Sequence, residues 1–159
     1  MVRFNQRNPK WYNVTIGNTD IPLGKMGCTI CSVCAVHSDF YPKDYITPPE
    51  AAKEWYFIDS GKLAASIHWA KTDFTGMNFE WRQRGYKKEK DYQKVAAHAN
   101  NPYLGVIIQV DNVHWVAVKK AILGEFIIMD PWYGHYKWLR TSPYKEITGY
   151  ALFTKKLPD

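Results

Sequence analysis

The pattern of the sequence changes at Asn101-Pro102, and this change limits the folds that the chain can adopt. Before this point, apolar residues recur at helical spacing between helix-capping signals. After it come short segments rich in β-branched and aromatic residues, separated by turn signals: YLGVIIQV, HWVAVKK, EFIIMD, HYKWLR and EITGYALFTK. Helices followed by a run of antiparallel strands indicate the α+β class. We expect a helical half packed on a sheet half, with any shared site in the cleft between them.

Four helices are predicted ahead of the strands. Gly27 precedes the first helix, and Thr47-Pro48 with Glu50 forms a capping box at the start of the second, which Gly61 follows. The expected ranges are 28–39, 48–60, 62–74 and 88–101. Residues 1–25, rich in Asn, Pro and Gly, are expected to be an irregular leader with one short strand.

The length and composition favour one globular domain covering residues 1–159. Such a length can bury a core without disulfides or metal, and a hydrophobic content of 46% argues against disorder. The longest apolar runs are far shorter than the roughly 18 residues of a membrane span. Since the N-terminus has no apolar signal region, we expect a cytoplasmic protein, and a monomer.

The formal charge of +6 indicates either an ordinary basic surface or an affinity for anionic partners such as nucleic acid, cell-wall polymer or an acidic substrate. The densest basic run, RQRGYKKEKDYQK, is interrupted by Glu89 and Asp91. This mixture is typical of an exposed loop and helix face rather than a nucleic-acid arm, so no nucleic-acid partner is expected.

All three cysteines lie in MGCTICSVCAVH, at positions 28, 31 and 34. An iron–sulfur run of this spacing needs a fourth cysteine, and the chain has none. A zinc site made of these cysteines and His37 would draw four ligands from one short helix, whereas structural zinc sites draw on two elements. A redox disulfide between Cys28 and Cys31 would follow a strand, and none is predicted there. We therefore expect no metal and no cofactor.

Cys28 differs from the other two cysteines by its position. It follows Gly27 and would occupy the first turn of a helix, where free backbone N–H groups and the helix dipole stabilise a thiolate. Cys31 and Cys34 are expected to be buried packing residues, because free cysteine is among the most buried residue types. Cys28 is thus the candidate nucleophile, and a nucleophilic thiolate needs a base.

His114 is the strongest candidate for that base. His37 lies on the same helix as Cys28, over two turns away, while His68 and His98 fall in helical patterns and His135 in a turn. A hairpin centred on Ile122 would place His114 directly opposite Asp130, at a Cβ separation of about 4.5–5.5 Å. The alternative is an ordinary edge histidine beside a turn-forming Asp-Pro, and the hairpin alone does not choose between them.

Four segments of the chain, in order, resemble the papain-like cysteine peptidases. They are QRNPKW at 6–11, GKMGCTICSVC at 24–34 with Ser32 in place, TPPEAAKEW at 47–55, and NVHWVAVKK with FIIMDPWYG near the end. The nearest branch is similar to the peptidases that process double-glycine leader peptides, and to their stand-alone bacterial and phage relatives. The resemblance covers nearly the whole chain and implies a papain-like fold.

The resemblance implies a triad of Cys28, His114 and Asp130, with a glutamine amide in the oxyanion hole. The usual position for that amide, six residues before the cysteine, is Pro22 here, so the role passes to Gln6, with Asn18 as a fallback. The implied activity is hydrolysis of a peptide or isopeptide bond in a peptide, protein or peptidoglycan substrate, as in a cell-wall or phage-associated lytic enzyme. A transglutaminase or deamidase with the same triad, and a non-catalytic papain-like binding module, remain alternatives.

Overall fold

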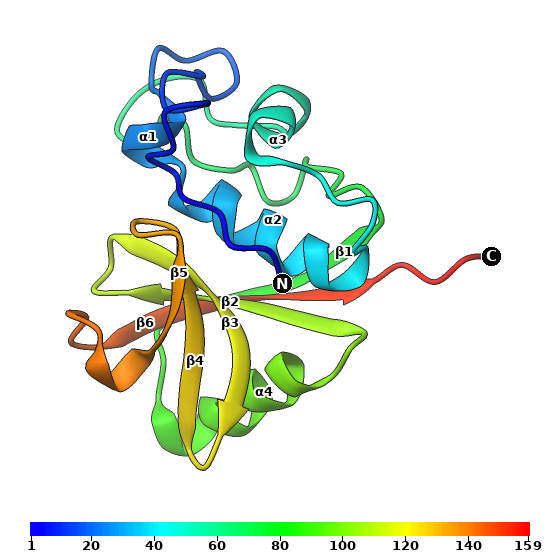
Figure 1. The fold of residues 1–159 in the computed structure, drawn as a ribbon, viewed down its shortest axis with the longest axis vertical. Helices are drawn as coiled ribbons and strands as arrows, with labels where there is room; N and C mark the ends of the chain where they lie inside the picture. The colour runs from blue at the N-terminus through cyan, green and yellow to red at the C-terminus, as the bar shows by residue number, and fades with distance from the viewer.

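The computed structural model describes residues 1–159 as a six-stranded antiparallel sheet with helices on both faces (Figure 1). The helices are α1 (Leu23–Met26), α2 (Cys28–Phe40), α3 (Pro48–Glu54) and α4 (Lys88–Asn100), and a 3-10 helix covers Leu139–Thr141. The strands are β1 (Met77–Arg84), β2 (Leu104–Val110), β3 (His114–Ile122), β4 (Glu125–Asp130), β5 (His135–Trp138) and β6 (Ile147–Lys155), in the sheet order β1-β6-β2-β3-β4-β5. None of the helices has the length and apolar character needed to cross a bilayer.

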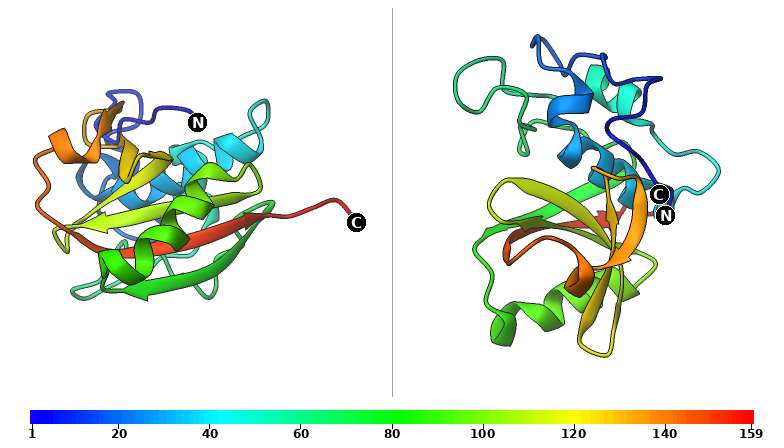
Figure 2. Two further views of the ribbon diagram at one scale, coloured as in Figure 1. Left: turned by 90° about the horizontal axis from the view of Figure 1, so that it is seen from below. Right: turned by 60° about the vertical axis from the view of Figure 1, so that its left-hand side comes forward.

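The sheet separates two hydrophobic clusters. On one face, α2 and α3 pack with the residue 55–74 segment over Ile107, Ala117 and Met129. On the other, Val95 of α4 packs against Val106, Ile108 and neighbouring strand residues. Figures 1 and 2 show α4 on the side of the sheet opposite to α2. The predicted combination of helices with an antiparallel sheet is confirmed, but α4 covers the far face instead of joining a single helical half.

Helix α2 is buried on almost every side, which explains its apolar sequence. Its buried residues include Ile30, Val33 and Phe40, and a helix apolar all round belongs in a protein interior. The buried Ser32 hydroxyl donates a hydrogen bond to the Trp115 carbonyl oxygen at 3.1 Å. Because Ser32 lies one turn after Cys28, this bond fixes the start of α2 against the start of β3.

The second and third predicted helices need correction. The capping box is present, since the Thr47 backbone N–H donates to the Glu50 carboxylate at 2.8 Å, but α3 ends at Glu54. The chain then becomes extended and buries Trp55 in the core. Residues 62–74 form turns and no helix. Ala65 adopts a φ of 68°, incompatible with a right-handed helix, and Ile67 pairs with Phe57 in an isolated bridge.

The sequence analysis does not predict strand β1, because the end of this strand overlaps the basic run, whose mixed charge is typical of a loop and helix face. It lies at the edge of the sheet and pairs with β6, with an irregularity between Phe79 and Trp81. The alternation of Met77, Phe79 and Trp81 with polar residues is a strand signal. The last strand of the chain therefore has neighbours on both sides.

The β3–β4 hairpin exists, but its register differs from the prediction. Leu123 and Gly124 form a two-residue turn with positive φ angles of 51° and 81°, the requirement of a type I′ turn. Val118 pairs with Ile128, two positions away from the predicted partner, and a bulge follows Val118. A shift of two residues keeps every side chain on the same face of the sheet, so His114 and Asp130 still face the same way.

Candidate functional site

His114 and Asp130 form the centre of the site. His114 Nε2 lies 2.9 Å from Asp130 Oδ1, although Asp130 pairs across the sheet with His135. The contact is diagonal rather than directly across, and long side chains bridge such diagonal positions. The predicted contact is therefore confirmed, while the predicted register is wrong. With Nε2 on Asp130, Nδ1 is the ring nitrogen left to act elsewhere.

The Asp130 carboxylate is fully buried and surrounded by donors. Oδ1 also accepts the Trp132 backbone N–H at 3.0 Å, and Oδ2 accepts the Tyr144 hydroxyl at 2.7 Å. Lys137 Nζ lies 3.6 Å from Oδ2. Burial raises the pKa of this carboxyl, but the hydrogen bonds from His114 and Tyr144 outweigh burial and lower it. Asp130 is therefore a carboxylate that orients the imidazole.

Tyr144 and Lys137 were not found from the sequence. Tyr144 lies between the 3-10 helix and β6, and Lys137 lies in β5, so neither is near Cys28, His114 or Asp130 in a recognisable motif. Their contacts with Asp130 arise only when β4, β5 and the segment before β6 come together. A lone tyrosine after Ser142-Pro143 carries no sequence signal for such a role.

Cys28 is the first residue of α2 and is partly exposed. The residue before it, Gly27, has to be glycine, because a Cβ at this position would lie 2.4 Å from the Leu23 carbonyl oxygen. Burial raises the pKa of the Cys28 thiol. The hydrogen bond from His114 and its charge lower this pKa, as do hydrogen bonds from the Trp115 backbone and Thr29. Together they outweigh burial, so the pKa of Cys28 lies below its usual value. The structure thus brings Cys28 to His114, as predicted from their expected roles.

The pKa of the His114 imidazole is shifted in the opposite direction, upward. Burial lowers its pKa, but the hydrogen bonds to Asp130 and Cys28 and the charges of both raise it to about 9. A lowered thiol pKa beside a raised imidazole pKa favours a thiolate–imidazolium pair over the neutral pair. Proximity of these groups and the local charges both favour an activated nucleophile at Cys28.

Gln6 lies between the segments that carry Cys28 and Asp130. Its backbone N–H donates to the Pro131 carbonyl oxygen at 2.9 Å, and its Nε2 donates to the Gly24 carbonyl oxygen at 3.3 Å. The side chain is 1% exposed, and Oε1 has no hydrogen-bond partner. The Gln6 amide makes no hydrogen bond to the Cys28 sulfur, so its oxyanion role stays a prediction. Asn18, the fallback, is on an exposed turn.

The other residues of the cysteine segment are packing residues. All three cysteines are free, and Cys31 and Cys34 are completely buried, which raises the pKa of both thiols well above the usual value. His37 is buried and bonds to main-chain groups of Thr75 and Ile46. No three side chains of His, Cys, Asp or Glu come together as a metal site would need.

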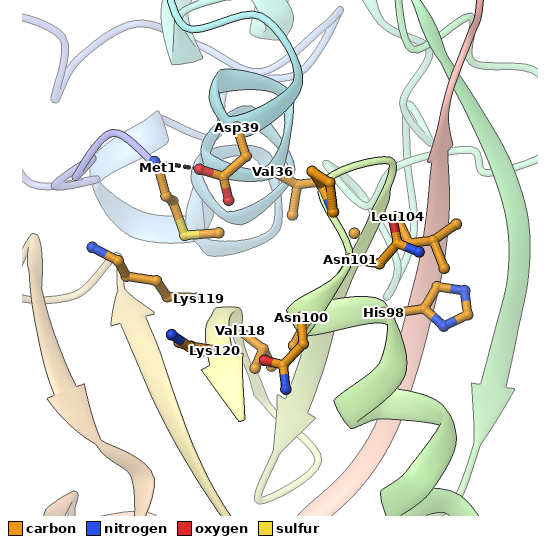
Figure 3. Close-up of a pocket in the computed structure, with 13 residues that line it drawn as sticks. Met1, Val36, Asp39, His98, Asn100, Asn101, Leu104, Val118, Lys119 and Lys120 are labelled. Atoms are coloured by element: carbon orange, nitrogen blue, oxygen red, sulfur yellow. Dashed lines mark ion pairs between the residues drawn. The ribbon is translucent and has the colours of Figure 1, made fainter. Parts of the chain in front are cut away.

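One hollow of the surface lies away from Cys28. It has a volume of about 330 Å³ and lies between the ends of α2 and α4 and strand β3. Figure 3 shows Lys119 and Lys120 on one side of it, His98 on the other, and the Met1 amino group paired with Asp39 above. None of the residues that form the thiol site lines it, so this hollow is separate from the thiol site.

The chain was compared with models of protein families, with curated proteins and with solved structures, and none of them matches it.

Proposed function

We propose that the protein is a papain-like cysteine peptidase that hydrolyses amide bonds through a thioester on Cys28. One observation carries the proposal: a thiol at the start of a helix contacts an imidazole whose far nitrogen is held, at 2.9 Å, by a buried carboxylate. A nucleophile, a base and an orienting group in this order are the requirement for covalent catalysis by a thiol. The order of the four sequence segments quoted above supports the same family.

In the acylation step, the Cys28 thiolate attacks the carbonyl carbon, and a carbon–sulfur bond forms while the carbonyl electrons move to oxygen. When the tetrahedral species collapses, the carbon–nitrogen bond breaks, and His114 gives its Nδ1 proton to the leaving amine. Asp130 keeps the proton on Nε2 and holds the ring in this orientation, as a buried carboxylate with a lowered pKa can do.

In the deacylation step, water attacks the thioester while His114 Nδ1 takes one of its protons. Collapse then releases a carboxylic acid and restores the thiolate–imidazolium pair. The Cys28 backbone N–H, in the first turn of α2, and the Gln6 amide are the proposed oxyanion donors. Removal of one such donor lowers the rate by about 10²–10³.

The proposed substrate is a peptide or isopeptide bond in a protein or in peptidoglycan. The charge of +6 favours an anionic polymer, which supports a cell-wall lytic enzyme. Transglutamination and deamidation would use the same residues, and the products separate the three reactions. Hydrolysis of a chain yields two fragments, deamidation adds about one mass unit, and transglutamination joins two chains.

Alkylation of the thiols tests the activated nucleophile without a known substrate. Iodoacetamide modification across pH, followed for each cysteine by mass spectrometry, should show Cys28 alone reacting fast below pH 7. His114→Ala should slow it and move the reaction towards the usual thiol range near 8.5. Cys31→Ser is the matched control, because it removes a buried thiol from the same helix. Equal reactivity of Cys28 and Cys34, or no effect of His114→Ala, would contradict the proposal.

A further inference from the structure

Arg82 is a cation without a counter-ion, and it contacts the ring of Trp115, the residue after His114. It lies on β1, is half-buried, and makes no ion pair and no side-chain hydrogen bond. Its Nε is completely buried and has no partner. Buried polar groups are normally paired, and a buried charge without a partner costs free energy. Such a group in a folded protein indicates that something else satisfies it.

Two indole rings hold the Arg82 guanidinium in place. Its Cζ is 5.2 Å from the Trp115 ring centroid and 5.8 Å from that of Trp69. Contacts with aromatic faces orient a guanidinium and leave its outer N–H groups free to meet a planar anion in the bidentate way that suits carboxylates. Burial, with the charge of Arg84, lowers the pKa of Arg82, and an anion beside it would relieve both effects.

Trp115 connects Arg82 to the thiol. Its backbone N–H is one of the donors that lower the pKa of Cys28, its carbonyl accepts the Ser32 hydroxyl, and it follows His114 in the chain. The same residue therefore contacts the nucleophile through its backbone and the arginine through its ring. Trp115 is thus the residue that links Arg82 to Cys28.

The sheet register places a second arginine beside the first. Arg84 pairs with Gly149, Gly149 with Gln109, and Gln109 with Trp115, so these four residues form one row across the sheet. Arg82 lies two residues before Arg84 on the same strand, hence on the same face. Gly149 has no side chain, and the Gln109 side chain and the Gln83 carbonyl oxygen lie close to the place that its Cβ would take.

We propose that Arg82 binds a carboxylate of the substrate, so that this protein acts on peptides with an acidic side chain or a free C-terminal carboxylate close to the cleaved bond. This inference rests on the proposed function, because it assigns the substrate class of the same site. Arg82 acts as a specificity residue: it holds the anion and takes no part in proton transfer.

Paired peptide electrophiles test the proposal without a known substrate. The first series consists of chloroacetyl peptides. In each peptide, a spacer of zero to two glycines joins the chloroacetyl group to the last residue, which is Glu-amide, Gln-amide or a glycine with a free carboxylate. The second series carries the electrophile at the other end, as chloromethyl ketones of acetylated Glu or Gln peptides. In each, the thiolate displaces chloride and forms a thioether, and the rate at Cys28 is read by intact-mass spectrometry. The two kinds of acid distinguish a side-chain from a C-terminal carboxylate.

In the unmodified protein, we expect an acidic probe of one spacing to react about ten-fold faster than its amide pair at low salt, the usual range for a charge-assisted hydrogen bond. Arg82→Gln should bring the ratio to within about two-fold, and Arg82→Lys should restore part of it. Arg3→Gln is the matched control: this exposed arginine also lies over an aromatic ring, that of Tyr136, and its loss should leave the ratio unchanged.

Acidic and neutral probes reacting equally at every spacing, or a preference that survives Arg82→Gln, would overturn the proposal. Chloroacetamide serves as the reference probe for the thiol itself. Slow reaction of Cys28 with chloroacetamide at pH 7 would count against the proposed function alone, since the acid-to-amide ratio can still be measured at pH 9, where a thiolate forms without activation. Circular dichroism of each variant establishes that it is folded.

Discussion

Tyr144 donates a hydrogen bond to Asp130 Oδ2 at 2.7 Å, on the opposite side of the carboxylate from His114. The Tyr144 ring also lies against the His114 imidazole, with 5.3 Å between the ring centroids. One side chain therefore contacts both the carboxylate and the imidazole. The Asp111 carboxylate holds this segment by accepting the backbone N–H groups of Lys145 and Glu146, which ties the β2–β3 turn to the same network.

Replacing Tyr144 by phenylalanine should destabilise the protein while keeping the ring contact with His114. The variant leaves the buried Oδ2 of Asp130 with Lys137 alone, at 3.6 Å, and an underpaired buried charged acceptor costs about 1–3 kcal/mol. Urea denaturation measures the change. Tyr133→Phe is the matched control, because Tyr133 is exposed and its hydroxyl makes no hydrogen bond. Equal stability of the two variants would show that the Tyr144 hydroxyl contributes nothing.

Alkylation of Cys28 and catalytic turnover should depend on pH in different ways: both rise with pH in the lower range, and only turnover falls again at high pH. The rise occurs as the thiol loses its proton below the usual range, because the Cys28 pKa is lowered. Catalytic turnover should fall again near pH 9, where His114 loses the proton that the leaving amine requires. Alkylation needs no such proton and should not fall there. A turnover profile that keeps rising above pH 10 would contradict the role of His114 as the acid.

The same raised pKa makes His114 a pH-dependent contributor to stability. Its folded-state pKa of about 9 lies above the unfolded value near 6.5, so the contribution is complete below about 6.5 and is lost as pH rises through 9. Because the lowered pKa of the Cys28 thiol contributes in the opposite sense, the comparison is made in Cys28→Ser: its unfolding free energy should fall between pH 7 and 10 more than that of the Cys28→Ser/His114→Gln double variant. Parallel curves in urea denaturation would contradict the ion pair.

The local parts of the site were predictable from the sequence. Gly27 before Cys28 indicates the start of a helix, and the strand pattern around His114 and Asp130 indicates a hairpin on which both side chains share a face. The hairpin register was not predictable, because the bulge after Val118 and the Leu123-Gly124 turn move the pairing by two residues. The contact survived since the side-chain period of a strand is two.

The parts that the sequence did not predict depend on contacts between distant segments. Residues 62–74 have helical composition, but burying Ile67 and Phe74 against the sheet requires turns, and tertiary packing overrides local propensity. The roles of Tyr144 and Arg82 arise only where several strands meet. Neither residue has a neighbour in the sequence that would have marked it.

His37 should make the fold sensitive to acid. Its Nδ1 accepts the Ile46 backbone N–H at 3.2 Å, so it must be neutral, and Nε2 donates to the Thr75 carbonyl oxygen at 2.8 Å. Burial lowers its pKa. The contribution to stability is present above about 6.5 and is lost as pH falls through the lowered folded-state value. Urea denaturation at falling pH should show a smaller loss in His37→Gln than in the wild type.

Gly27→Ala should lower the reactivity of Cys28 although the thiol itself is unchanged. An added Cβ would lie 2.4 Å from the Leu23 carbonyl oxygen and 3.1 Å from the Leu23 Cδ2, so α1 must move away from the start of α2. Such overpacking costs about 1–3 kcal/mol, and the displacement should separate Cys28 from His114. We expect slower alkylation of Cys28 below pH 7 together with a lower urea midpoint. Gly61→Asn is the matched control, since a Cβ at Gly61 meets no atom within 4 Å and asparagine tolerates its positive φ. If Gly27→Ala keeps wild-type alkylation rates, the close approach of Gly27 to Leu23 does not position the thiol.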